Sequence, residues 1–189
     1  MTTTPAIVVS DLVKRYKGAD RNAVDGVSFT VEQGSLFALL GPNGAGKTTT
    51  ISILTTATSG SVQIAGADLA HDQSEVRRRV GIIFQKPSLD RALTGEENCR
   101  FHAALYGAYA YRPSFGLMPR EYRERIVELG ALVGLDRDDL FKKISKYSGG
   151  MRRKLEIARS LLHRPQVLFL DEPTVGLDPE SRRSVAGYL

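Results

Sequence analysis

The chain of 189 residues has a single cysteine and no apolar run long enough to cross a bilayer. Because Cys99 has no second cysteine to pair with, an internal disulfide is excluded, which fits a reducing compartment. Apolar stretches such as residues 36–40 and 167–170 are far shorter than the roughly 20 residues of a membrane-spanning helix. The first residues, MTTTPAIVVSD, lack a basic segment and a long apolar one, so we expect no signal peptide and a chain that is soluble when isolated.

Charge of one sign is only slightly in excess, with a formal net charge of +5. The densest basic clusters are residues 77–79 and 152–154, and both fall on expected helices. Positive charge dispersed in this way is typical of a solvated surface, so we expect no nucleic-acid partner. The three histidines, His71, His102 and His163, share no spacing that suggests a metal site.

Short strand patterns alternate with helical ones along the chain. Strands are expected over residues 6–13, 26–32, 35–41, 59–66, 80–85 and 166–172. Helices are expected at about residues 47–56, 72–79, 94–106, from 119, 151–163 and from 178. The apolar runs at 35–41, 80–85 and 166–172 read as strands buried on both faces. Buried strands joined by helices predict an α/β fold with a mostly parallel core sheet.

Two of the expected helices carry a capping-box pattern at their start. Asp72 with Glu75, and Thr94 with Glu97, have the spacing in which each side chain caps the other's backbone. Between residues 86 and 146 there is little strand signal, so this stretch reads as a helical insert. Its Tyr-rich part at 106–118 is either a subunit-contact loop or a packed insertion, and we favour packing.

A glycine-rich loop carries the strongest chemical signal. The sequence GPNGAGKT at 41–48 matches G-x-x-x-x-G-K-[S/T] and lies between an expected strand and an expected helix, which is the context of a P-loop. Gly44 and Gly46 let the backbone wrap a triphosphate with its N–H groups inward. Lys47 is then placed to reach the β- and γ-phosphates, and Thr48 to bind Mg²⁺. A tight turn with a chance lysine is the alternative, and both flanking elements argue against it.

Polar side chains end two of the expected buried strands. Asp171 would hold Mg²⁺ and Glu172 would polarise the attacking water, because ligands bind at the carboxyl ends of such strands. Gln85 ends another strand, where touching Mg²⁺ or water and being merely a polar strand end are equally open. Tyr16 could stack on adenine, although an isolated tyrosine is more often a packing residue.

A second anion-binding turn lies far along the chain. In YSGGM, residues 147–151, two glycines stand just before a basic helical run, so the turn offers free N–H groups at a helix N-terminus. The P-loop already supplies a phosphate site for this chain. The turn is therefore a second anion site, which the P-loop of the same chain does not require for binding phosphate.

The order of these motifs resembles the ATP-binding subunit of ABC transporters over essentially the whole chain. The order is Tyr16, the P-loop, Gln85, the helical insert, YSGGM and LFLDEPTVGLDP. YSGGM resembles the family signature Leu-Ser-Gly-Gly-Gln, with Tyr147 and Met151 as departures. Together with GPNGAGKTTTISIL and DEPTVGLDP, this variant is most similar to drug-exporter ATPases of the daunorubicin-resistance type.

The resemblance implies how the two phosphate turns divide their work. Two copies would meet head to tail, so that the signature turn of one contacts the γ-phosphate on the P-loop of the other. The fold implied is a P-loop NTPase with an N-terminal antiparallel β subdomain, a core of residues 1–85 and 147–189, and a helical subdomain of 86–146.

The implied site residues fall into three sets. ATP contacts are expected from Tyr16, Gly41, Pro42, Asn43, Gly44, Ala45, Gly46, Lys47, Thr48, Thr49, Ser148, Gly149, Gly150 and Asp178. The expected catalytic residues are Glu172, Gln85 and Lys47, and the expected Mg²⁺ ligands are Thr48, Gln85 and Asp171.

The implied function is an ATPase that drives an exporter through a separate membrane permease, from the cytoplasmic face of the membrane. The sequence ends at Leu189, before the place where the family carries a switch histidine. We therefore expect a truncated chain that binds ATP with slow turnover. Alternatives are a nucleotide-binding module with little or no turnover and, less favoured, an ABC ATPase that acts on nucleic acid or ribosomes.

Overall fold

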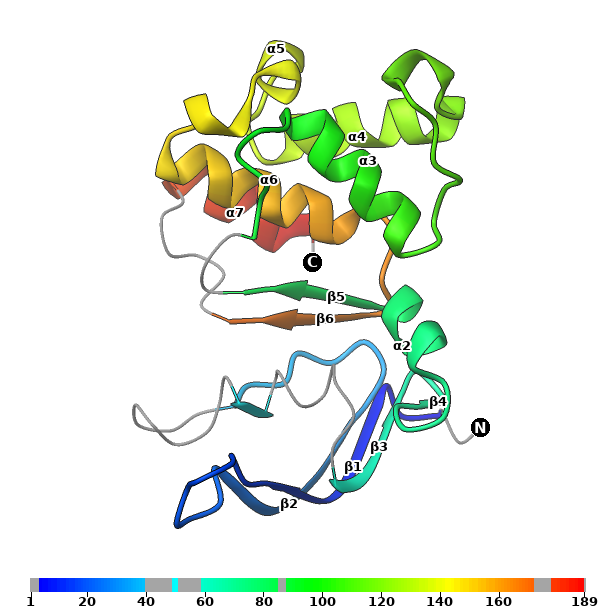
Figure 1. The fold of residues 1–189 in the computed structure, drawn as a ribbon, viewed down its shortest axis with the longest axis vertical. Helices are drawn as coiled ribbons and strands as arrows, with labels where there is room; N and C mark the ends of the chain where they lie inside the picture. The colour runs from blue at the N-terminus through cyan, green and yellow to red at the C-terminus, as the bar shows by residue number, and fades with distance from the viewer. Residues whose placement is uncertain (1–3, 40–48, 51–58, 85–87, 172–177, 189) are drawn as a thin grey trace. The chain divides into compact units, whose positions relative to one another are not determined.

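The computed structural model describes residues 4–39, 49–50, 59–84, 88–171 and 178–188 of the chain (Figure 1). The chain divides into two compact units, Met1–Val80 and Gly81–Leu189. Among the helices of the described residues, none is both long enough and apolar enough to cross a membrane.

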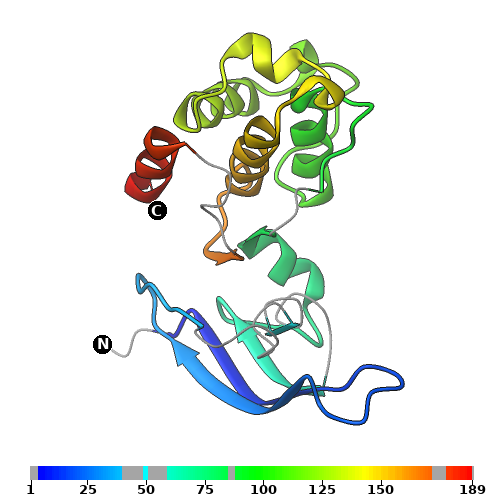
Figure 2. The same ribbon diagram turned by 90° about the vertical axis from the view of Figure 1, so that its left-hand side faces the viewer.

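The first unit is built on an antiparallel sheet with the strand order β2-β1-β3-β4. The strands are β1 (Ile7–Lys14), β2 (Val24–Val31), β3 (Ser59–Ile64) and β4 (Ala67–Asp68). Figure 2 shows this sheet curving as it passes from strand to strand. Apolar side chains alternate with polar ones along β2, so one face is covered and the other meets water. The covered side chains include Ile7, Val9, Leu12, Val24, Val31, Val62 and Ile64.

Helix α2 (Gln73–Arg79) confirms an expected helix but not its expected cap. Asp72 occupies the N-cap position, yet its side chain makes no capping hydrogen bond. Glu75 instead pairs with Arg78 and Arg79, which lie three and four residues further along the same helix face. The predicted capping box is wrong here because a carboxylate that faces two guanidinium groups gains more from charged partners than from one backbone N–H.

The strand expected at 35–41 is a second correction within the described residues. Residues 35–39 form no strand, and Leu36 is 94% exposed. Phe37 finds its apolar contact on Phe29 of β2, with stacked rings 5.1 Å apart. A continuous apolar run does not by itself establish a buried strand: residues 35–38 are exposed here, and Phe37 is only partly covered by its contact with Phe29.

The second unit pairs strand β5 (Val80–Ile83) with β6 (Val167–Leu170). Both arrows run in the same direction in Figure 1, so the pair is parallel, as expected. The Asp171 backbone N–H donates to the Ile83 carbonyl at 2.9 Å and closes the pair at its carboxyl end. In Figures 1 and 2 the helices of this unit gather on one side of the pair.

Five α-helices and two 3-10 turns complete the described part of the second unit. They are α3 (Gly95–Leu105), η1 (Phe115–Leu117), α4 (Arg120–Leu132), α5 (Arg137–Phe141), η2 (Ile144–Lys146), α6 (Gly149–Leu161) and α7 (Pro179–Tyr188). The capping box of Thr94 and Glu97 is present at the start of α3, as predicted. Pro119 is the N-cap of α4 rather than its first residue.

The core of the second unit forms where α3, α4 and α6 meet. Tyr122, Ile126 and Leu129 of α4, with Val133 just after it, recur at helical spacing and are all fully buried. From α6, Leu155 and Ala158 face the same core. This packing fixes the rotation of α6 and therefore the direction in which its polar side chains point.

The Tyr-rich stretch at 106–118 is packed onto this core, which supports the interpretation that we favoured. Tyr109 and Phe115 both lie edge-on against Tyr122, with ring centroids 5.5 and 6.5 Å away. The buried Arg100 guanidinium donates to the Arg112 carbonyl at 2.7 Å. The stretch is thus tied to the core by apolar and polar contacts together.

Candidate functional site

The expected site residues divide between described and undescribed parts of the chain. Residues 41–48, Gln85 and Glu172 lie outside the described residues. In the first unit, Tyr16 follows β1 and is 52% exposed, and the Lys14 ammonium lies 5.7 Å from the centre of its ring. Thr49 is helical and half-buried. The other described candidates all belong to the second unit.

The turn at Ser148 begins helix α6 and is open to solvent. Ser148 is the N-cap, and its side-chain oxygen accepts the Met151 backbone N–H at 3.1 Å. Ser148 and Gly149 are exposed. Helix geometry leaves the first N–H groups of α6 without intrahelical acceptors, and the positive end of the helix dipole lies among them. The turn can therefore receive an anionic group from outside the chain.

Tyr147 anchors this turn from within, and its fit depends on a glycine. Its hydroxyl donates to the Asp139 carbonyl at 2.6 Å, and the residue is 4% exposed. A Cβ at Gly95 would collide with that hydroxyl and would lie 3.0 Å from the Leu140 carbonyl. Glycine as the first residue of α3 thus leaves the space that the Tyr147 hydroxyl occupies.

Asp171 stands at the carboxyl end of β6, half-buried, as the sequence predicts. Its backbone N–H is bound to β5 and its carbonyl accepts from Arg153 of α6 at 3.3 Å. One positioned carboxylate suits Mg²⁺, which usually takes one or two protein carboxylates together with waters and substrate phosphates. Asp171 therefore fits the role of a metal ligand.

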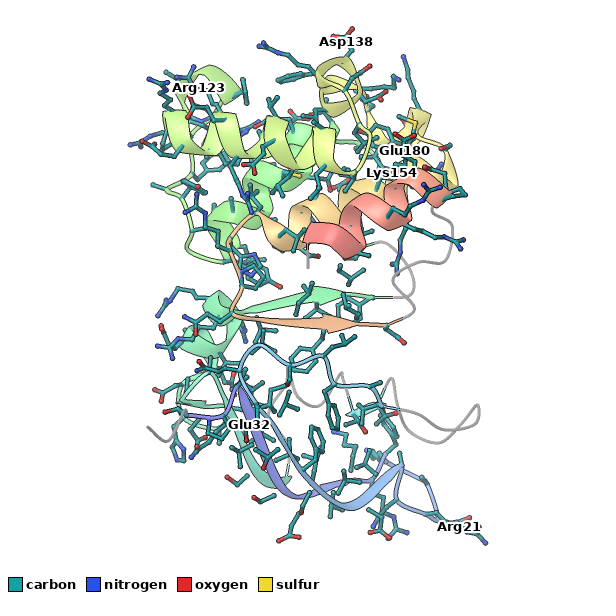
Figure 3. The ribbon with its side chains drawn as sticks, turned by 180° about the vertical axis from the view of Figure 1, so that it is seen from behind. Arg21, Glu32, Arg123, Asp138, Lys154 and Glu180 are labelled. Carbon is teal, nitrogen blue, oxygen red and sulfur yellow. The ribbon has the colours of Figure 1, made fainter. Side chains whose placement is uncertain are left out.

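Asp178 immediately precedes α7 and is joined to α6. Its carboxylate lies 2.8 Å from the Lys154 ammonium, which Figure 3 labels, and accepts the Ser181 backbone N–H at 3.0 Å. The Lys154 contact and then the Ser181 hydrogen bonds hold the pKa of Asp178 well below its usual range. Asp178 thus stays charged and connected to the same helix that begins at Ser148.

Sequence reasoning missed the polar face of α6 that points at the strand ends. Arg153 is 3% exposed and donates to the carbonyls of Phe84 and Asp171. One turn further on, Glu156 accepts the Ser88 backbone N–H at 3.3 Å, and Arg159 donates to the Ser88 carbonyl at 3.1 Å. The available signal was a series of charged residues that flank the apolar face of the helix. Periodicity alone does not say what such residues contact.

The remaining polar candidates do not form a site among the described residues. No group of three or more His, Cys, Asp or Glu side chains gathers in the part of the chain that the structure describes. Cys99 is fully buried, and burial raises the pKa of its thiol to about 12. His102 and His163 pack as rings with centroids 5.3 Å apart, a contact that their sequence spacing did not reveal.

Comparison with known proteins gives a consistent result. The family model described as ABC transporter matches residues 24–175. The daunorubicin/doxorubicin resistance ATP-binding protein DrrA of Streptomyces peucetius is 44% identical over 98% of this chain and 54% of its own length. The chain thus spans about half the length of that relative.

Solved structures agree in fold. The structure of an ATP-binding subunit of an ABC transporter matches with a TM-score of 0.82 and 32% identity, over 97% of this chain and 72% of that one. A dimeric ATP-binding cassette in a post-hydrolysis state, bound to ADP and Pi, matches with a TM-score of 0.82 and 25% identity, over 96% and 80%. With the family model matching most of its length, this chain belongs to the ABC transporter family.

Proposed function

We propose that the chain is the ATP-binding and hydrolysing part of an exporter for a drug or a related substrate. The observation that carries the proposal is the exposed, capped turn at Ser148, which presents helix N–H groups outward although the chain has a P-loop of its own. A solvent-facing anion site of this kind suits the phosphates of a nucleotide held by a second copy. The family match and the drug-resistance relative support the same proposal.

The proposed roles follow the chemistry of each side chain. Lys47 neutralises the β- and γ-phosphates, and Thr48, Gln85 and Asp171 hold Mg²⁺. Bound Mg²⁺ neutralises charge on the phosphate oxygens. Glu172 orients the attacking water as a general base. The exposed Tyr16 ring offers a stacking surface for adenine.

The proposed partners are a second copy of the chain and a separate membrane permease. In the head-to-tail dimer, Ser148, Gly149 and Gly150 of one copy face the γ-phosphate on the other copy's P-loop, with Asp178 at the same interface. A structural neighbour forms a dimer with ADP and Pi bound, which supports this assembly. The permease places the dimer at the cytoplasmic face of the cell membrane.

A pair of substitutions at Ser148 separates its structural role from its proposed role. Asp is as good an N-cap as Ser, so Ser148→Asp preserves the bond to the Met151 N–H while adding a negative charge where the γ-phosphate would lie. We expect Ser148→Asp to retain the thermal stability and the ATP affinity of the monomer. ATP-dependent dimerisation, measured by sedimentation with Glu172→Gln in both chains to block turnover, should be lost.

The matched control is Ser148→Ala, which removes the cap without adding charge. It should lower stability by about 1 kcal/mol while weakening dimerisation less than Ser148→Asp. ATP-dependent dimers of normal strength in Ser148→Asp would contradict the role of the turn. Lys47→Ala tests the cis site, and unchanged ATP affinity by calorimetry in that variant would exclude the P-loop as the binding site.

A further inference from the structure

Helix α6 contacts the chain at both described strand ends of the second unit. Its first residues form the turn at Ser148, and its next turn carries Arg153, which is 3% exposed. That guanidinium donates one N–H to the Phe84 carbonyl, just past β5, and another to the Asp171 carbonyl, just past β6, at 3.3 Å. One side chain therefore holds the carboxyl ends of two parallel strands together.

Both acceptor carbonyls belong to residues at or next to the proposed Mg²⁺ ligands. Asp171 is itself the proposed Mg²⁺ ligand, and Phe84 directly precedes Gln85 in the sequence. We propose that Arg153 is a positioning residue for the metal-binding carboxylate: by fixing the Asp171 backbone against β5, it sets the place from which that carboxylate binds Mg²⁺. This inference rests on the proposed function and names a residue that acts through Asp171.

The type of side chain fits the task. A guanidinium carries several N–H donors in a rigid, planar fork, so it can satisfy two carbonyls at a fixed separation. A lysine ammonium is a flexible point donor without that fork. Phe84 and Asp171 are half-buried, and losing the guanidinium takes a charged donor from both carbonyls and lets the strand ends shift. Residues that orient a metal ligand typically contribute 10- to 100-fold to metal affinity, as a rough range.

The same helix also contacts Ser88, the residue that follows 85–87 in the sequence. Glu156 accepts the Ser88 backbone N–H at 3.3 Å, and Arg159 donates to the Ser88 hydroxyl at 2.9 Å. Phe84 and Ser88, which flank residues 85–87, are thus both bound to α6. The helix that begins at the Ser148 turn therefore binds both described residues that flank residues 85–87, and Asp171 as well.

The experiment measures the gain in nucleotide affinity that Mg²⁺ provides, without requiring turnover. Calorimetry with a non-hydrolysable ATP analogue, in excess Mg²⁺ and in EDTA, gives this gain for the whole chain. We expect Arg153→Met to keep the affinity in EDTA, which depends on the P-loop, and to lose about tenfold of the Mg²⁺-dependent gain. Arg153→Lys, which can reach only one carbonyl at a time, should retain an intermediate gain.

Ser160→Ala is the matched control. Ser160 is also a buried α6 residue that donates to a β5 carbonyl, that of Ile82, at 2.9 Å. It binds the middle of the strand rather than its end, so its loss should lower stability and leave the Mg²⁺ gain unchanged. If Arg153→Met does not fold, Arg153→Lys decides the question against the same control.

The outcomes separate the inference from the function beneath it. A wild-type chain that binds no nucleotide in either condition contradicts the proposed function. A wild-type chain that binds, with a Mg²⁺ gain that Arg153→Met or Arg153→Lys fully retains, overturns the positioning role. Equal loss of the gain in Ser160→Ala would also overturn it, because the effect would then follow stability alone.

Discussion

His102 lies on α3 with its ring stacked on Tyr106, at a centroid distance of 4.1 Å, and tilted against His163. Its Nε2 atom is buried and has no hydrogen-bond partner within the described residues. Burial first, and then the positive charge of Arg159, lower the pKa of His102 to about 3. The folded chain therefore holds this imidazole neutral well below the pH at which a solvated histidine gains a proton.

The sign of the resulting pH dependence follows directly. Below about pH 6.5 the unfolded chain protonates His102 and the folded chain does not, so stability falls from there until the pH reaches about 3. At pH 5 the loss from this residue is about 2 kcal/mol. Urea unfolding at pH 7 and pH 5 should show that His102→Phe, which keeps an aromatic ring beside Tyr106, reduces the difference. An equal difference in both proteins would contradict the assignment.

The fit between Gly95 and Tyr147 is a second property of single residues. Gly95→Ala places a methyl group against the Tyr147 hydroxyl and close to the Leu140 carbonyl, so it should cost about 1–3 kcal/mol in unfolding free energy. Tyr147→Phe removes the hydroxyl and its bond to Asp139, but it also opens space. In a double-mutant cycle, Gly95→Ala should cost less in the Tyr147→Phe background. Additive costs would show that the two side chains do not meet.

Among the elements, the helices at 73–79 and 95–105 offer a direct comparison of two expected capping boxes. Thr94→Ala should lower stability by about 1 kcal/mol, because the Thr94 side chain accepts the Glu97 backbone N–H at 3.2 Å. Asp72→Ala is the control, since Asp72 makes no capping bond, and it should change stability by less than half as much. Chemical denaturation of the two variants measures both values, and similar losses would contradict the difference between the helices.

Local pattern was sufficient for most helices and strands but not for their partners. The α4 face of Tyr122, Ile126 and Leu129 was predictable because a 3.6-residue period reports which side of a helix is covered. The pairing of Glu75 with two arginines was not, because a capping box and an i, i+4 ion pair use the same carboxylate. Which of two competing local bonds forms depends on side-chain geometry, and the spacing of residues in the sequence does not specify that geometry.

The candidate site shows the same limit more strongly. Ser148 and Asp171 were predictable because a turn before a helix and a carboxylate after a strand carry chemical meaning in sequence alone. Arg153 was not, because its acceptors are main-chain carbonyls, which have no residue type to recognise. Contacts from a side chain to distant backbone therefore require the fold.

For the whole molecule, the proposed dimer makes a prediction that a monomeric site cannot meet. A chain with Lys47→Ala keeps its turn, and a chain with Ser148→Asp keeps its P-loop. In a dimer of the two, one of the two shared sites therefore has both an intact P-loop and an intact turn. We expect each variant alone to form no ATP-dependent dimer and the mixture to form the heterodimer, with Glu172→Gln in both chains. Two tags of different mass distinguish heterodimers in sedimentation or native mass spectrometry. No heterodimer in the mixture would contradict the sharing of sites between copies.

The two units also differ in how far apart along the chain their strand partners lie. The sheet β2-β1-β3-β4 draws every strand from the first 68 residues, so all of its strands have been made before residue 81 is added to the chain. β5 must instead wait for β6, because the Ile83 carbonyl is bound by the Asp171 N–H. At about 5–20 residues per second, that wait lasts several seconds, during which an apolar strand has no partner. The newly made chain is therefore most exposed to misassembly and to chaperone capture between the synthesis of residue 83 and that of residue 171.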